Sequence, residues 1–225
     1  MKIVRYGACD DIDVQFLDEH GYIYYHNVYT NFKKGQIKNP YDRNIFGVGY
    51  IGDGKYGTGD AVKRTQEEYV WRGMLERCYG DKYKDVHSTY YDKCTVCDEW
   101  HNFQSFAEWY TQNFYQVGTE RMHLDKDILV KGNKFYSPDT CLIVPQRINM
   151  LFLQKPNKYN LPSGISPMAN NRYRADYNGK KVGNYNTLEE AIQAHDNEKR
   201  KAIRNIAKEY KPVIPNKLYE ALLNW

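Results

Sequence analysis

The centre of the chain contains three residues that can hold a metal ion or accept a proton. His123, Asp125 and Asp127 occupy every second position, and alternate residues of a β-strand share a face. One imidazole and two carboxylates on one face can bind a divalent cation such as Mg²⁺. A polar strand face without an ion is the alternative. The spacing therefore predicts one of these two arrangements around Asp125.

The cysteines offer a second set of metal ligands. There are five of them, and an odd number in a chain of this length favours reduced thiols or a metal site over a disulfide framework. Cys94 and Cys97 form a Cys-x-x-Cys pair, which is half of a zinc signature, and His87 lies nearby in sequence. Buried thiols without zinc are the alternative. A tetrahedral zinc site would use Cys78, Cys94, Cys97 and Cys141.

Basic residues are concentrated toward the C-terminal end. The whole chain has a net charge of +4, but from Lys155 onward 13 lysines and arginines stand against seven acidic residues. Such a concentration attracts a polyanion by releasing its counterions. A solvated helix face would have a similar composition. We favour that interpretation for the cluster Lys199, Arg200 and Lys201, which could also touch phosphates.

The elements that must position these residues indicate an α+β fold. We expect a β-rich N-terminal module over residues 1–60, a central domain over 61–155, a C-terminal domain over 161–212 and a tail over 213–225. In the first module, residues 12–17 and 22–25 predict a hairpin, and no helix is indicated. No run approaches the roughly 18 apolar residues of a membrane helix, and the first residues lack the features of a signal peptide. We therefore expect a cytoplasmic protein with no membrane partner.

The central domain should contain a compact ββα unit flanked by helices. Thr65 and Glu68 form a capping-box pair in front of one helix, whose apolar positions recur at helical spacing. A second helix follows Trp100 and carries aromatic residues on one face. Two strands, a Gly-Asn turn and a short helix fit the sequence between about His123 and Asn149.

This ββα unit resembles the His-Asn-His (HNH) endonucleases of phages and mobile introns, whose metal-binding motif begins with an Asp-His pair and ends on a helix bearing His or Asn. In that resemblance Asp125 and Asn149 match metal ligands, while Lys126 stands where the general-base histidine should be and Thr140 where the central asparagine should be. A lysine protonated at neutral pH cannot take a proton from the attacking water. The resemblance therefore implies a scaffold that kept binding and lost cleavage, or a nuclease with a displaced histidine. That nuclease would use the catalytic residues His123, Asp125 and Asn149, with Mg²⁺ or another divalent metal on Asp125, Asp127 and Asn149.

The last domain is expected to form a three-stranded antiparallel sheet followed by one long helix. Asn178-Gly179 is a type I′ turn signal, and Thr187 with Glu190 forms a capping box. The apolar pattern continues the helix past Arg204.

The landmarks between Gly164 and Asp196 resemble the ethylene-response-factor type of DNA-binding domain, known in plant transcription factors and phage HNH proteins. They are a Gly-Ile start, an aromatic-x-Ala centre, a Gly-Lys turn, a Gly-x-Tyr-x-Thr-x-Glu-Glu-Ala join and an Ala-x-Asp helix. The resemblance implies that the sheet lies in the major groove, where arginines pair with guanine and lysines hold phosphates. The DNA-binding residues that it implies are Asn170, Asn171, Arg172, Tyr173, Arg174, Lys180 and Lys181.

The function that these features favour is that of a phage or mobile-element protein that binds double-stranded DNA in the host cytoplasm, with or without HNH homing-type cleavage. The alternative is a non-enzymatic viral protein that binds a host protein, as a host-takeover or anti-defence inhibitor. A tyrosine-rich surface would serve that role, because 22 residues are tyrosine. Salt should separate the two, since DNA affinity falls steeply with salt and a tyrosine interface changes little.

Overall fold

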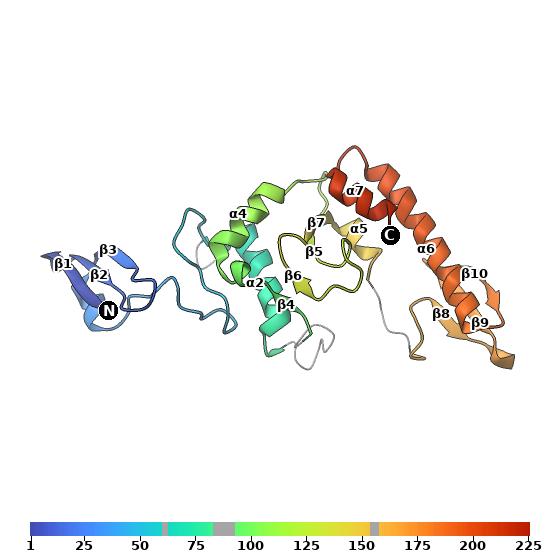
Figure 1. The fold of residues 1–225 in the computed structure, drawn as a ribbon, viewed down its shortest axis with the longest axis horizontal. Coiled ribbons are helices and arrows are strands. Elements are labelled where there is room, and N and C mark those ends of the chain that lie inside the picture. The colour runs from blue at the N-terminus through green and yellow to red at the C-terminus, as the bar shows by residue number, and fades with distance from the viewer. Residues whose placement is uncertain (60–62, 83–92, 154–157) are drawn as a thin grey trace. The chain divides into compact units, whose positions relative to one another are not determined.

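The computed structural model describes residues 1–59, 63–82, 93–153 and 158–225, and it has the expected α+β class (Figure 1). The chain divides into two compact units, Met1–Gln112 and Asn113–Trp225. None of the helices in these described ranges is long and apolar enough to cross a bilayer.

The first unit begins with an antiparallel sheet in the order β1-β2-β3, formed by β1 (Lys2–Ala8), β2 (Asp11–Gln15) and β3 (Ile23–Asn27). The expected hairpin is the β2-β3 pair. Ile12 and Val14 on the central strand are fully buried. The expectation of no helix here was wrong, because α1 (Tyr29–Lys33) follows β3. Its N-cap, Val28, makes no side-chain cap, so the sequence carried no start signal.

After α1, the described part of the first unit contains two α-helices, a short strand and a 3-10 helix. They are α2 (Gln66–Tyr79), β4 (Thr95–Val96), the 3-10 helix η1 (Asp98–His101) and α4 (Phe103–Asn113). Thr65 caps α2 as expected, accepting from the Glu68 N–H at 3.3 Å. Trp71 on α2 is fully buried, and its indole N–H donates to the Trp100 carbonyl oxygen at 2.7 Å. The apolar faces that the spacing predicted form this core.

The second unit contains the expected two strands and short helix. They are β5 (Met122–Asp125), β7 (Leu142–Pro145) and α5 (Gln146–Met150), with the two-residue strand β6 (Phe135–Tyr136) before β7. β5 pairs with β7 in antiparallel register, so that His123 lies opposite Val144 and Asp125 opposite Leu142.

The chain ends with the expected three strands and long helix, followed by one more helix. β8 (Ile165–Pro167), the 3-10 turn η2 (Ala169–Asn171), β9 (Tyr173–Tyr177) and β10 (Lys180–Tyr185) precede α6 (Leu188–Tyr210) and α7 (Asn216–Leu223). The sheet is antiparallel, in the order β10-β9-β8. Asn178 and Gly179 both have positive φ, 50° and 74°, as a type I′ turn requires. The Thr187–Glu190 capping box is complete.

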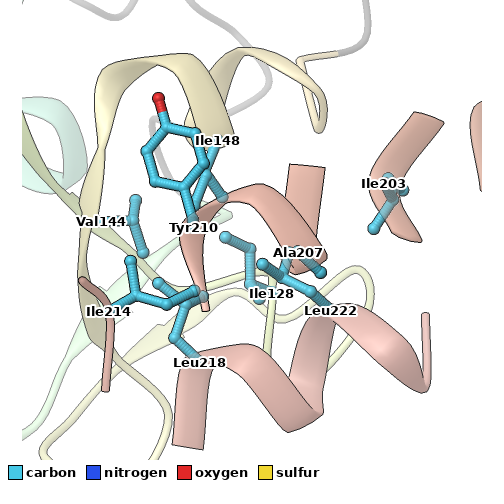
Figure 2. Close-up of a cluster of buried hydrophobic side chains, with 9 residues drawn as sticks. All are labelled: Ile128, Val144, Ile148, Ile203, Ala207, Tyr210, Ile214, Leu218 and Leu222. Carbon is cyan, nitrogen blue, oxygen red and sulfur yellow. The ribbon is translucent and has the colours of Figure 1, made fainter. Parts of the chain in front are cut away.

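Helix α6 belongs to two hydrophobic clusters. Near its start, Ala191 packs with Ile165 and Ala175 of the sheet. Near its end, Ala207 belongs to a cluster that also contains residues of the ββα unit and of α7. Figure 2 shows the nine side chains of that cluster, which are Ile128, Val144, Ile148, Ile203, Ala207, Tyr210, Ile214, Leu218 and Leu222. Residues 213–225, expected as a tail, therefore contribute to a core.

Candidate functional site

The ββα unit brings two of the predicted catalytic residues together. His123 on β5 and Asn149 on α5 are in contact, with Asn149 Nδ2 and His123 Nδ1 3.0 Å apart. The other ring nitrogen of His123, Nε2, is buried. A general base must reach the proton that it abstracts. This ring is therefore placed to hold the helix against the strand rather than to meet a water on an open surface.

Asp125 closes the turn that follows β5. Its Oδ1 accepts hydrogen bonds from the backbone N–H groups of Asp127 and Ile128, both at 2.8 Å. Burial raises the pKa of Asp125 above its ordinary value, and these two N–H bonds oppose the shift. Asp125 is 9% exposed. Its carboxyl therefore serves to accept hydrogen bonds from the backbone of the turn.

Lys126, which the resemblance places where an HNH nuclease has its general base, is a buried and fixed cation. Its Nζ donates to both carboxylate oxygens of Asp127, at 2.9 and 2.8 Å, and to the Asn133 carbonyl oxygen at 2.6 Å. The Asn133 side chain donates back to the Lys126 carbonyl oxygen at 2.9 Å. Thr140 donates to the Phe135 carbonyl oxygen at 2.8 Å. Lys126 and Thr140 thus both hold loops in place.

The predicted metal ligands, Asp125, Asp127 and Asn149, do not fit the metal centre of an HNH nuclease. Both oxygens of Asp127 are occupied by the ammonium of Lys126, which would repel a cation bound to the same oxygens. Asp125 is engaged by two backbone N–H groups, and Asn149 by His123. We therefore assign no reaction step to a metal here.

The β8–β10 sheet separates an apolar face from a basic one. Ala175 faces α6 and is fully buried, so the neighbouring β9 residues Arg174 and Asp176 face outward. Arg172 and Arg174 are exposed, and Lys181 on β10 is exposed opposite Asp176. The predicted residues Arg172, Arg174 and Lys181 therefore share the outer face of the sheet.

The remaining predicted DNA contacts lie elsewhere in the same domain. Tyr173 is on the inner face, where it packs against the cluster around Ala191, so its side chain does not lie beside Arg172 and Arg174. Lys180 is exposed beside the hairpin turn, opposite Tyr177. Asn170 and Asn171 are exposed in η2 with positive φ, 58° and 53°, which asparagine tolerates better than most residues.

Asp176 is a site residue that the sequence analysis missed. Its Oδ1 accepts from Arg174 Nε at 2.9 Å and from Arg174 Nη2 at 2.6 Å. The guanidinium is therefore oriented before any ligand binds, and its Nη1 can donate to another partner. Alternation along β9 was the available signal, since it places positions 174 and 176 on one face.

The predicted zinc ligands are divided between the two units, with Cys141 in the second. Cys78, Cys94 and Cys141 are buried, and burial raises the pKa of the half-buried Cys97 thiol. No cysteine in the described ranges belongs to a group of three or more potential ligand atoms within 4.8 Å of one another. His87 lies outside those ranges. The zinc site stays a prediction.

Two polar features of the first unit were not expected. Asp11, Asp13 and His26 form a group of potential ligand atoms within 4.8 Å of one another, but Arg5 donates to both carboxylates at 2.6–3.0 Å. This arginine and His26 lower the pKa of Asp11 to about 2. The group is therefore an ion-pair cluster that already contains its cation.

The second unexpected feature is His101, which is 7% exposed and closes η1. Burial lowers its pKa, although Asp98 Oδ1 lies 3.6 Å from Nδ1. Burial therefore favours the neutral form of this imidazole. An isolated histidine after a core tryptophan gave no signal by which this could be predicted.

Comparison of the chain with protein-family models, curated proteins and solved structures gave no match.

Proposed function

We propose that this protein binds duplex DNA through the outer face of its β8–β10 sheet. The observation that carries the proposal is the pair of unlike sheet faces: Arg172, Arg174 and Lys181 are exposed on one, and Ala175 is buried against α6 on the other. The major groove of B-DNA admits a β-ribbon, and arginine donors match the O6 and N7 acceptors of guanine. Lysines beside them can hold phosphates.

Arg174 is the residue that we expect to read a base. Asp176 occupies Nε and one edge of Nη2, which leaves Nη1 and the outer edge of Nη2 free to donate in a bidentate fashion. A guanidinium that is held before binding loses less conformational freedom on binding. Arg174 should therefore contribute sequence preference, and Lys181 general affinity.

Phosphodiester cleavage is not part of the proposal, because Lys126 occupies Asp127 and the buried Nε2 of His123 faces no open surface. The phage or mobile-element origin and the host cytoplasm remain inferences from the resemblance. We expect supercoiled plasmid to stay intact with Mg²⁺ or Mn²⁺. Nicking that disappears in both His123→Ala and Asp125→Ala variants would restore the nuclease.

A second candidate function is binding of a host protein, favoured by exposed tyrosines on the N-terminal sheet. Tyr6 on β1 and Tyr24 and Tyr25 on β3 are 59%, 43% and 61% exposed. Tyrosine is enriched at protein interfaces because it joins an apolar ring to a polar tip. Such an interface would persist in moderate salt.

The test is DNA affinity measured by fluorescence anisotropy over a range of salt concentrations. A sheet variant, Arg172→Gln with Arg174→Gln and Lys181→Gln, should bind at least about tenfold more weakly than wild type, since each good arginine-guanine pair contributes roughly 1–3 kcal/mol. A control with the same charge change replaces the exposed Lys2, Lys34 and Lys38 by Gln. Equal affinities of the two variants would contradict the proposal.

A further inference from the structure

The exposed face of α6 carries a second concentration of positive charge, distinct from the sheet. From position 200 to the residue after the helix, the basic exposed residues are Arg200, Lys201, Arg204, Lys208 and Lys211. The opposite face is buried, with Ile203 and Ala207 in the core shown in Figure 2. Lys199 is 8% exposed, and its Nζ lies 4.6 Å from the centre of the Trp225 ring. The solvated helix face that the sequence suggested for Lys199, Arg200 and Lys201 therefore holds for Arg200 and Lys201 and does not include Lys199.

Three of these residues form a row along the helix, which we call the basic ridge: Arg200, Arg204 and Lys208. They are four positions apart, so each lies one turn after the previous one, about 6 Å further along the axis and within an arc of about 80°. The ridge is therefore about 12 Å long.

The basic ridge is not neutralised by the rest of the described structure. Glu209 is directed to α5, where it forms an ion pair with Arg147. Glu198 pairs with Lys201, outside the ridge, at 2.7 Å. Within the described ranges, Arg200, Arg204 and Lys208 form no ion pair, and Arg200 meets just the Asn197 side chain, at 3.5 Å. Their charge is available to an external partner.

Helix stability does not explain the basic ridge. Like charges at i and i+4 destabilise a helix, whereas alternation with glutamate would stabilise it. Basic residues in the last turn are favourable to the helix dipole, which accounts for Lys208. Arg200 and Arg204 lie before that turn, so the dipole gives no reason for them.

We infer that the basic ridge is a second DNA-binding surface, which holds phosphates of the duplex that the sheet contacts. A row of positive charge is complementary to a phosphate strand, because duplex DNA carries one negative charge per about 1.7 Å of its axis. The inference rests on the proposed function for the identity of the polyanion. The ridge supplies affinity without sequence preference, since phosphate contacts carry no base information.

The experiment compares four proteins on one 30-base-pair duplex labelled for anisotropy: wild type, the sheet variant, the lysine control and a ridge variant. The ridge variant carries Arg200→Gln, Arg204→Gln and Lys208→Gln, which keep helix propensity close to that of Arg and Lys. For wild type, log K falls linearly with log salt concentration, with a slope of about −0.9 per neutralised phosphate. We expect the slope of the ridge variant to be shallower by about 2 to 3. Circular dichroism and thermal unfolding would verify that the variant stays folded.

Each outcome decides between the two surfaces. A ridge variant with the wild-type slope, beside a weakened sheet variant, would overturn the ridge and leave the sheet proposal standing. A weakened ridge variant beside an unaffected sheet variant would support the ridge and refute the sheet. A ridge variant that matches the lysine control would reduce the effect to net charge and overturn the inference. Wild-type protein that binds no duplex would overturn both.

Discussion

Lys126 determines what the loop after β5 can do. The residue is 5% exposed, and its ammonium donates hydrogen bonds to a carboxylate and to a carbonyl oxygen. A histidine at this position could exchange a proton with water, whereas the Lys126 ammonium donates to both oxygens of Asp127. One residue thus holds this loop through an ion pair with Asp127.

We expect Lys126→Met to destabilise the second unit by roughly 1–3 kcal/mol, because it removes the ammonium and leaves Asp127 and the Asn133 carbonyl without that donor. Methionine keeps most of the aliphatic stem, so lost packing contributes little. Urea unfolding followed by tryptophan fluorescence would measure the change. The exposed Lys134→Met is the matched control, and equal stabilities of the two variants would refute the structural role.

His101 predicts a pH dependence of stability. Its pKa in the folded protein is lowered by burial, so the unfolded chain, with a value of about 6.5, binds a proton more readily. The stabilisation is complete above pH 6.5 and is lost as the pH falls below it, by at most about 1.4 kcal/mol per pH unit. Unfolding free energies at pH 7.5 and 5.5 should differ less in His101→Gln than in wild type. A parallel dependence in both proteins would show that His101 does not titrate in this way.

At the scale of elements, features that depend on local sequence could be predicted, whereas features that depend on tertiary packing could not. The type I′ turn at Asn178-Gly179 and the start of α6 were predictable because their signals lie within a few residues. The side of the sheet taken by Tyr173 was not, since it depends on packing against α6. The burial of Lys199 beside Trp225 was also hidden, because it joins positions 26 residues apart.

The capping box of α6 gives a prediction at this scale. Thr187→Ala removes the acceptor of the Glu190 N–H, now at 3.2 Å, and should cost about 1 kcal/mol of unfolding free energy. Thr187→Ser keeps the hydroxyl and should restore most of it. Thermal unfolding of the three proteins would test the pair, and an alanine variant as stable as the serine variant would show that the cap is dispensable.

For the second unit as a whole, the residues after 212 are part of a core. Leu218 and Leu222 on α7 are 0% and 1% exposed and belong to the same cluster as Val144 of β7. A segment of 13 residues after a recognised domain looked like a tail because its length allows no core of its own. Its partners are residues far away in sequence.

We expect Leu218→Ala to destabilise the second unit by roughly 2–5 kcal/mol, the usual range for a fully buried leucine. The neighbouring Lys217 is exposed, and Lys217→Ala should change stability little. Chemical denaturation would give both values. A Leu218 variant that unfolds like the Lys217 variant would show that α7 is not needed for this core.

Helix α6 also sets the distance between the two hydrophobic clusters to which it belongs. Ala191 lies in the sheet cluster and Ala207 in the cluster with the ββα unit, and this separation corresponds to about 24 Å of helix, close to seven base-pair steps of DNA. Figure 1 shows the helix as one uninterrupted element. Insertion of two residues before Arg200 would turn everything after it by about 200°. Insertion of a whole heptad would lengthen α6 by about 10 Å and almost preserve its phase. The helix therefore fixes both the distance and the angle between its two hydrophobic clusters.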